Sequence, residues 1–369
     1  MCLYPRIIKN RKYTATQKNG GHPPPVCDNR ILAIPVGCGN CMECRKQKAR
    51  MWNTRLQEEI KESKNGKFIT LTFSDESIKE LTEEIRRKAN KTIEEIKENK
   101  IEDKEKEKIQ REINKTNGYG LDNQIATIAV RRWLERHRKR TKKSIKHWLV
   151  TELGGNNTER IHLHGIIWTE EPLKIIEEEW KYGRMWKGKE KNGKIENYVN
   201  GQTINYMTKY VTKLDVKHKY YKSIILTSAG IGKGYIKSHN YDNNKYREEE
   251  ETNETYRNEN GSKSNLPIYY RNKRYTEEER EKLWIKKIDE QVRYVLGVKI
   301  DISNGEEEYR RALKEAQQKN VEMGYNTGIK NWSEEQYEKE RRIIKQKESG
   351  NTSGGPFRET GGAPGGGFS

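Results

Sequence analysis

The sequence predicts an α+β fold, in which antiparallel strands are flanked by helices. Two strand-like runs, His147 to Glu152 and Ile161 to Trp168, enclose a Gly- and Asn-rich loop at 154–158, a pattern typical of a β-hairpin. A third run, Phe68 to Phe73, is rich in β-branched and aromatic residues, and alternation places its two threonines on one face. Around these runs, apolar residues recur at helical intervals, which predicts the helices.

The composition indicates a polyanionic partner. The chain has 369 residues, 74 Lys and Arg against 55 Asp and Glu, a formal charge of +19 and a hydrophobic share of 31%. Because no basic amphipathic segment has a lipid anchor beside it, nucleic acid is favoured over a membrane surface. No run approaches the roughly 18 apolar residues of a membrane span. The first residues also lack the apolar core of a signal peptide, so we expect a cytosolic protein.

The five cysteines lie within the first 44 residues, and Cys38, Cys41 and Cys44 repeat the Cys-x2-Cys interval of zinc sites. We predict a structural Zn²⁺ site here, a zinc knuckle. The candidates for its fourth ligand are Cys27, which we favour, Cys2 and, less favoured, His22. The alternatives are unliganded reduced thiols and a redox or iron–sulfur role, although no fourth cysteine follows a regular cluster spacing.

Two charged segments follow the first strand. Residues 75–115 hold 25 charged residues in 41, nearly balanced in sign, with apolar residues at helical intervals, and we predict two exposed helices there. Residues 131–147 carry nine Lys or Arg and one Glu, on and after a helix predicted from Ile125 to Arg140. Such one-sided charge favours phosphate contact over a solvated helix face. The predicted DNA contacts are Arg131, Arg132, Arg136, Arg138 and Lys139.

The remaining elements are predicted from turn residues and periodicity. We expect a helix over 172–180, short strands around 182–186 and 195–199, a polar loop over 238–264, and helices over 276–296, 306–323 and 333–345. The last 24 residues contain 8 Gly and little to bury, so we expect them to be disordered. The predicted units are a cysteine-rich region 1–60, a core 61–237 that includes the insert 75–115, a polar and helical region 238–345, and a tail 346–369.

The pair His162 and His164 is the most informative feature. Residues i and i+2 of a strand point to one face, so the two imidazoles can bind one divalent metal ion. Glu152, at the far end of the preceding strand, is the expected third ligand, with Glu159 or water as alternatives. A bare His-x-His pair is more often a pair of buried or surface histidines, so further residues must support the metal site.

That support comes from a predicted helix after the hairpin. Tyr206 and Tyr210 are four residues apart and therefore share a helix face, and Lys209 and Lys213 have the same spacing. The alternative is that the tyrosines pack on the core, but a separate apolar stripe is available for that purpose. We take Tyr206, Tyr210, Lys209 and Lys213 as candidate catalytic residues.

With these motifs in this order, the chain resembles the HUH endonucleases, and among them the replication-initiation proteins of microviruses, especially the gokushovirus type. Residues 68–73 resemble the first motif of that family, 161–167 its His-hydrophobic-His motif and 206–213 its two-tyrosine motif. The segments 38–44, 228–233 and 266–270 also resemble microvirus proteins, so the resemblance covers about residues 1–300. The insert 75–115 departs from it.

The resemblance implies an RNA-recognition-like antiparallel sheet and the nicking of one DNA strand at a viral origin to start rolling-circle replication. A tyrosine would attack a phosphodiester beside Mg²⁺ or Mn²⁺ held by His162, His164 and an acid. The metal or Lys209 would favour the anionic tyrosine. The products are a 5′-phosphotyrosine and a free 3′-OH, and the second tyrosine permits a later transfer that rejoins the ends.

The expected partners are single-stranded origin DNA and the host's helicase and polymerase, in the cytoplasm of a bacterial host. We expect no membrane partner and no small-molecule substrate, because the stretch 230–233 lacks the spacing of a P-loop and indicates a tight turn. The alternative function is a non-catalytic, zinc-stabilised nucleic-acid-binding regulator. Charge and zinc fit both, so only the histidine and tyrosine pairs discriminate.

Overall fold

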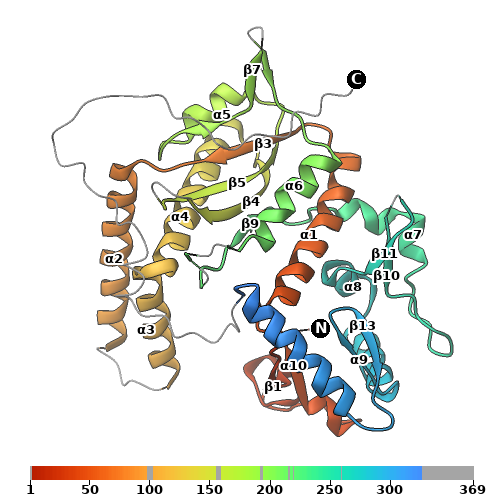
Figure 1. Cartoon of the computed structure of the whole chain (residues 1–369). Coiled ribbons are helices and arrows are strands. Elements are labelled where there is room, and N and C mark those ends of the chain that lie inside the picture. The colour runs from red at the N-terminus through yellow and green to blue at the C-terminus, as the bar shows by residue number, and fades with distance from the viewer. Residues whose placement is uncertain are drawn as a thin grey trace.

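The computed structural model describes residues 2–97, 103–154, 159–191, 194–214, 217–218, 220–258 and 260–325. At its centre is a five-stranded antiparallel sheet of order β6-β3-β5-β4-β9 (Figure 1). The strands are β3 (Gly66–Leu71), β4 (Lys146–Leu153), β5 (Ile161–Trp168), β6 (Met185–Trp186) and β9 (Ile225–Thr227). The α+β class is confirmed, and the RNA-recognition-like topology stays a prediction.

One face of the sheet packs on α2 (Asp75–Lys97), α4 (Gly118–Thr141) and α5 (Leu173–Glu179). Alternation along the strands sends every second side chain into this layer, including Leu149 and Leu163. Trp133 of α4 is completely buried there. Burying a large apolar side chain contributes roughly 1.5–3 kcal/mol, so this layer holds the strands firmly from behind.

The charged insert forms two helices, as predicted, namely α2 and α3 (Asp103–Thr116). The expectation that both are exposed is wrong for α2, because its apolar stripe is buried in the core. The buried residues of that stripe are Ile78, Leu81, Ile85 and Ala89. The helix spacing of three and four residues aligns them on one side and leaves the charges on the other.

The opposite face packs on α1 (Met42–Glu62) and α6 (Gly201–Thr212). In Figure 1 these two helices lie side by side in front of the sheet. They cover Trp148, Val150, Ile166 and Trp168, whose side chains alternate with those of the other layer. Gly66 makes this close packing possible at the sheet end, since a Cβ there would meet Val199 and Trp168 at 3.1 to 3.3 Å.

Asn197 takes the place of a strand at the outer edge of β3. Its side-chain oxygen accepts from Phe68 N at 2.8 Å, and its amide nitrogen donates to Phe68 O at 2.6 Å and to Lys187 O at 2.7 Å. Next to it stands a hairpin of β7 (Lys189–Lys191) and β8 (Lys194–Glu196). The strands predicted around 182–186 and 195–199 therefore become β6 and this hairpin.

Residues 233–289 form a second, tyrosine-rich core. Its elements are η4 (Lys233–Lys237), α7 (His239–Asp242), β10 (Thr255–Arg257), β11 (Lys263–Asn265), α8 (Ile268–Arg274) and α9 (Glu277–Asp289). The interpretation of 238–264 as a polar loop is wrong in part, because Tyr241 and Tyr256 pack on Tyr235 and Tyr270. Aromatic rings supply this core although the segment is poor in aliphatic residues.

The N-terminal region and the last described elements pack together. They comprise β1 (Arg6–Lys9), η1 (Arg11–Tyr13), η2 (Gln17–Asn19), η3 (Asn29–Leu32), β2 (Ala33–Val36), β12 (Val292–Val295), β13 (Val298–Asp301) and α10 (Glu307–Glu322). The helix predicted over 276–296 ends at Asp289 and a hairpin follows. Leu296 and Gly297 both have positive φ, 50° and 90°, which suits a two-residue turn and ends any helix.

The helix predicted over 306–323 is present as α10. The predicted helix 333–345, the tail 346–369 and most of the loop 154–158 lie outside the described residues. Within the described ranges, no helix is both long and apolar enough to span a bilayer.

Candidate active site and metal centres

The register of the central strands brings the predicted metal ligands together. Glu152 of β4 pairs directly with His162 of β5, and His164 follows on the same face. The carboxylate Oε2 lies 3.3 Å from His162 Nε2 and 3.0 Å from His164 Nε2, and the two Nε2 atoms are 3.0 Å apart. These three side chains form a compact triangle of donor atoms, which we call the His–Glu cluster.

The spacing of the His–Glu cluster suits one metal ion. Donors about 2.1 Å from an octahedral ion occupy neighbouring positions roughly 3.0 Å apart. Two imidazoles and a carboxylate are a donor set that Mn²⁺ accepts and that Mg²⁺ can use together with water. The observed separations of 3.0 to 3.3 Å therefore fit one face of such an ion.

Neighbouring groups orient both imidazoles toward that position. His162 Nδ1 lies 3.2 Å from Arg160 O, and a carbonyl can only accept, so Nδ1 carries the proton and Nε2 is left with its lone pair. His164 Nδ1 lies 3.0 Å from the Thr70 hydroxyl of β3. Thr70 is thus part of the site that sequence reasoning did not assign, although alternation had already placed it on a common face with Thr72.

Electrostatics keep this site ready for a cation. Burial by itself raises the pKa of Glu152, but hydrogen bonds with His162 and His164 and the Lys213 ammonium outweigh it and lower the pKa below its usual range. Burial lowers the pKa of His164 and favours the neutral imidazole. A charged carboxylate beside neutral imidazoles is the protonation state that binds a divalent ion.

The tyrosine helix α6 begins and lies as its sequence dictates. Asn200 caps it and forms a capping box with Thr203, and Ile204, Met207 and Val211 bury one stripe against the sheet. The other face carries the two tyrosines, as the separate stripes predicted. The ring of Tyr210 stacks on His164 with centroids 4.3 Å apart, and the two hydroxyls are 2.6 Å apart. Tyr206 is 44% exposed.

The two lysines of α6 have different surroundings. Lys213 forms an ion pair with Glu152, and its ammonium lies 5.8 Å from the centre of the Tyr210 ring. Lys209 is exposed, and its ammonium has no hydrogen bond or ion pair within the part of the chain that the structure describes. Burial and the bond to Tyr206 raise the pKa of Tyr210 well above its usual value, so a nearby cation must stabilise its anion. Lys213, rather than Lys209, is placed for that.

The alternative ligand Glu159 is held elsewhere. It is 2% exposed, has a φ of 47° and pairs with Lys217 at 3.2 Å and with His218 at 3.5 Å. Among the described residues, the two groups able to hold a metal ion are the His–Glu cluster and a cysteine cluster. Glu152 is therefore the acid of the site.

Comparison with known proteins gives one finding on this region. Residues 66–215 match the family of replication-associated proteins of the ORF2 type. This stretch, which we call the replication-protein segment, runs from the first residue of β3 to just beyond α6, and so contains the whole His–Glu cluster and both tyrosines. No curated protein and no solved structure matches the chain. The resemblance to replication initiators is confirmed at the level of this family, and the microvirus assignment stays a prediction.

The cysteine cluster lies outside the replication-protein segment, at the start of α1. It consists of Cys2, Cys38, Cys41 and Cys44, whose sulfur atoms all lie within 4.8 Å of one another. The pairs Cys2–Cys41 and Cys38–Cys44 are each 3.9 Å apart. Four sulfurs about 2.3 Å from a tetrahedral Zn²⁺ are about 3.8 Å apart, so the cluster has the dimensions of a zinc site.

Backbone groups support thiolates in this cluster. Tyr4 N and Cys38 N donate to the sulfur of Cys2 at 3.3 and 3.2 Å, and Cys41 N donates to that of Cys38 at 3.3 Å. Hydrogen bonds with the other two thiols of the knuckle lower the pKa of Cys38. The first thiolate therefore forms at Cys38, which is the form that binds metal.

The choice of Cys27 as fourth ligand is corrected by this geometry. Cys27 is exposed, and its sulfur lies 3.6 Å from Glu281 Oε1. Cys2 takes the fourth position because β1 pairs antiparallel with β2, with Arg6 opposite Val36, and this register carries the N-terminal residues to Cys38. His22 is likewise not part of the cluster.

The basic run lies on α4, behind the sheet of the replication-protein segment and away from the tyrosines. Arg132 pairs with Glu84 at 2.6 Å, and Arg136 donates to Glu179 O at 3.0 Å, so both hold helices together. Lys139 lies 3.3 Å from Glu135 within α4. Arg131 and Arg138 are exposed. DNA contact by these five residues stays a prediction.

Proposed function

We propose that the protein is a replication initiator that nicks single-stranded origin DNA as an HUH-type endonuclease, with Tyr206 or Tyr210 as nucleophile. One observation carries the proposal: in the replication-protein segment, two tyrosine hydroxyls 2.6 Å apart stand over a metal-binding triangle of Glu152, His162 and His164. A packing role for the tyrosines would require them to be buried, and Tyr206 is not.

The chemistry follows from these positions. A divalent ion bound by the His–Glu cluster supplies a Lewis acid that offsets the charge of the scissile phosphate. The tyrosine oxygen forms a bond to phosphorus while the bond from phosphorus to O3′ breaks and its electron pair stays on O3′. The tyrosine gives up one proton and O3′ takes up one, so the products are a 5′-phosphotyrosine and a free 3′-OH. Lys213 stabilises the tyrosine anion.

The second tyrosine makes the reaction repeatable. After one round of synthesis from the 3′-OH, the free tyrosine attacks the regenerated origin, and the released 3′-OH attacks the first phosphotyrosine and rejoins the ends. Each transfer exchanges one phosphoester for another, so no external energy source is needed. Host polymerase and helicase would extend and unwind the DNA in the bacterial cytoplasm, and the phage would be of the microvirus, gokushovirus-like type.

The test is covalent adduct formation. Purified protein is incubated with labelled single-stranded origin DNA and Mn²⁺, and the products are separated on a denaturing gel. We expect Tyr206→Phe and Tyr210→Phe each to retain some nicking, and the double variant to lose the adduct while still binding DNA. Tyr198→Phe, at an exposed tyrosine outside the site, is the matched control and should cut normally.

Two outcomes would contradict the proposal. An adduct formed by the double tyrosine variant would place the nucleophile elsewhere. Wild-type protein that binds origin DNA but never cuts it with Mg²⁺ or Mn²⁺ would favour the zinc-stabilised regulator instead.

A further inference from the structure

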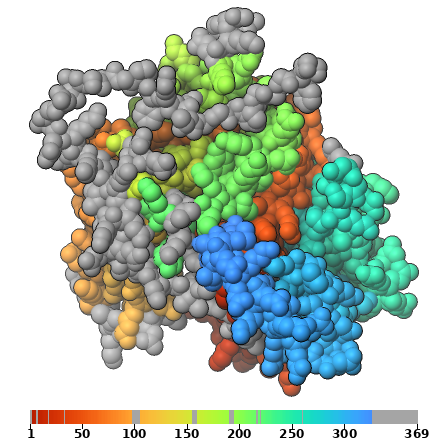
Figure 2. Space-filling model, in the orientation of Figure 1, coloured from red at the N-terminus to blue at the C-terminus, as the bar shows by residue number. Residues whose placement is uncertain are grey.

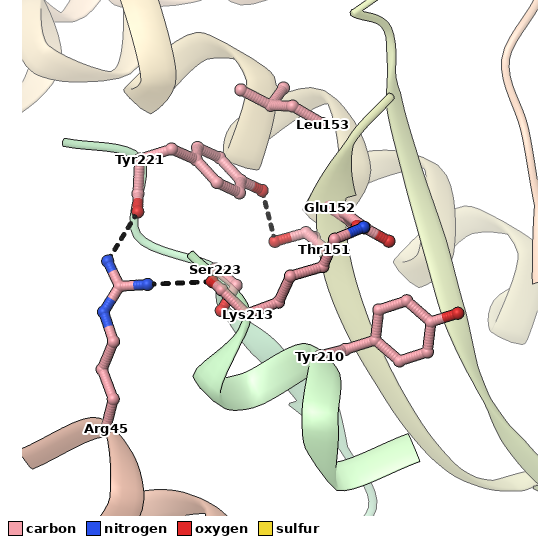
Figure 3. Close-up of a pocket in the computed structure, with 8 residues that line it drawn as sticks. All are labelled: Arg45, Thr151, Glu152, Leu153, Tyr210, Lys213, Tyr221 and Ser223. Atoms are coloured by element: carbon pink, nitrogen blue, oxygen red, sulfur yellow. Dashed lines mark hydrogen bonds and ion pairs between the residues drawn. The ribbon is translucent and has the colours of Figure 1, made fainter. Parts of the chain in front are cut away.

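Arg45 connects the cysteine cluster to the tyrosine helix. It follows Cys44 in the first turn of α1 and is 9% exposed. Its Nη1 donates to Lys213 O at 3.1 Å and its Nη2 to Tyr221 O at 3.2 Å. Figure 3 shows the guanidinium reaching from α1 toward the end of α6 and the segment that carries Tyr221.

The surroundings of this guanidinium are unusual for a buried charge. Within the described ranges, no acidic side chain lies at ion-pair distance from Arg45, and the ring of Tyr325 is 5.9 Å away. Its partners are backbone carbonyls, and Lys213 is the C-cap residue of α6. Carbonyls at a helix C-terminus carry partial negative charge and lack intrahelical partners, so a cation there is stabilising.

The bonds of Arg45 fix the end of α6 relative to the strand that carries Glu152. Tyr221, its second acceptor, donates from its hydroxyl to Thr151 Oγ1 at 2.7 Å, next to Glu152 in β4. The same pocket is lined by Tyr210, Lys213 and Glu152 (Figure 3). Lys48, one turn further along α1, donates to Ser223 O at 3.3 Å and holds the same segment.

The end of α10 closes this corner of the molecule. A Cβ on Gly324 would lie 2.8 Å from the side chain of Leu214, so the two helix ends are in close contact. Figure 2 shows α10, in blue, directly beside α6, in green. Asn320 of α10 in turn accepts from Met42 N at 2.8 Å, at the start of α1. The cysteine cluster, α10 and the tyrosine helix thus meet around Arg45.

We propose that Arg45 is a positioning residue for strand cleavage, which sets Tyr210 and Lys213 over the His–Glu cluster, and that the cysteine cluster fixes Arg45 in turn. The proposal rests on the proposed function. A misplacement near 1 Å of a reacting group can cost roughly a hundredfold in rate, so two hydrogen bonds at the end of a helix are enough to matter.

The first test separates cleavage from binding. Arg45→Met should slow single-turnover adduct formation by about tenfold or more while the Kd for single-stranded DNA changes by less than about threefold. Arg45→Lys should recover part of the rate, because one ammonium can serve one carbonyl. Arg55→Met is the matched control: Arg55 is also on α1 and donates to Ile231 O at 3.0 Å, but it does not reach α6.

The proposal is wrong if Arg45→Met cuts as fast as Arg55→Met. If Arg45→Met fails to fold, Arg45→Lys decides, and a wild-type rate in that variant would show that the fork of the guanidinium is not needed.

A second measurement does not depend on chemistry. Backbone hydrogen exchange at the last turn of α6 should accelerate in Arg45→Met and after metal extraction from wild-type protein, but not in Arg55→Met. If wild type never cuts DNA, the proposed function fails while this exchange result still tests the link. Unchanged exchange in both cases would overturn the link even in an active enzyme.

Discussion

At the scale of single residues, two glutamates of similar sequence context have different roles because of their neighbours. Glu152 faces two imidazoles whose lone pairs point at it, whereas Glu159 is enclosed with a lysine and a histidine. Sequence alone left both as possible ligands. The register of β4 against β5 decides between them.

We expect Glu152→Gln to weaken Mn²⁺ binding by about tenfold or more, because the amide removes the only negative donor of the His–Glu cluster. Isothermal titration at neutral pH measures this. Glu159→Gln is the matched control and should leave Mn²⁺ affinity unchanged, although it should lower thermal stability by disturbing a buried pair. Loss of Mn²⁺ binding in the control alone would move the site to Glu159.

The cysteines allow a similar pair of variants. We expect wild-type protein to hold one zinc per chain, Cys2→Ser to lose most of it and Cys27→Ser to keep it, since only Cys2 lies within the cluster. Elemental analysis after dialysis gives the count. Because metal binding is coupled to folding, Cys2→Ser should also melt earlier. Zinc retained by Cys2→Ser and lost by Cys27→Ser would restore the sequence-based choice.

The sequence predicted the residues whose spacing is local. His162 with His164, and Tyr206 with Tyr210, follow from strand and helix periodicity alone. Cys2 could not be chosen over Cys27, because β1 pairs with a strand distant in sequence and this pairing has no local signature. The role of Arg45 was equally out of reach, since its acceptors are backbone carbonyls distant in sequence.

At the scale of elements, the charged insert supports the sheet from behind. Glu84 of α2 accepts from Arg132 of α4 at 2.6 Å and from Lys88 at 2.5 Å, and these bonds lower the pKa of Glu84 to about 2. Sequence periodicity predicted both helices of the insert, but not that α2 is part of the core. The hairpin at 292–301 was mistaken for helix because the turn at Leu296 and Gly297 was not recognised.

A carboxylate with a lowered pKa stabilises the fold above its unfolded value near 4.5 and loses that effect as the pH falls toward 2. We expect Glu84→Gln to destabilise the protein by about 1 kcal/mol at pH 7, given the partial exposure of the pair. The difference from wild type should shrink as the pH falls from 4.5 to about 2. Urea unfolding at several pH values measures it. Glu107→Gln, in an exposed pair with Arg111 at 3.7 Å, should have no measurable effect.

At the scale of the whole molecule, the sheet separates the tyrosines from the basic run on α4. A single strand of about ten nucleotides held at the tyrosines would not reach both sides. We expect replacement of Arg131, Arg138 and Lys139 by Gln to leave the salt dependence of such a short strand unchanged. For a long strand that passes round the molecule, the slope should fall by about 0.7 for each phosphate that the variant no longer neutralises.

Fluorescence anisotropy over a range of salt concentrations measures both slopes. If neither slope changes, the run is a solvated helix face, and its predicted role in DNA binding is wrong. A fall in the slope for the short strand would mean that DNA approaches α4 directly.

The side chain of Asn197 has a consequence for the protein in concentrated solution. β6 has two residues and leaves Phe68 at the border of the sheet, where a free N–H and C=O would invite a strand from another molecule. The asparagine amide satisfies both groups and closes that border. Asn197 therefore protects the strand that carries Thr70 from intermolecular β-pairing, so that the sheet stays available to DNA instead of becoming the start of an aggregate.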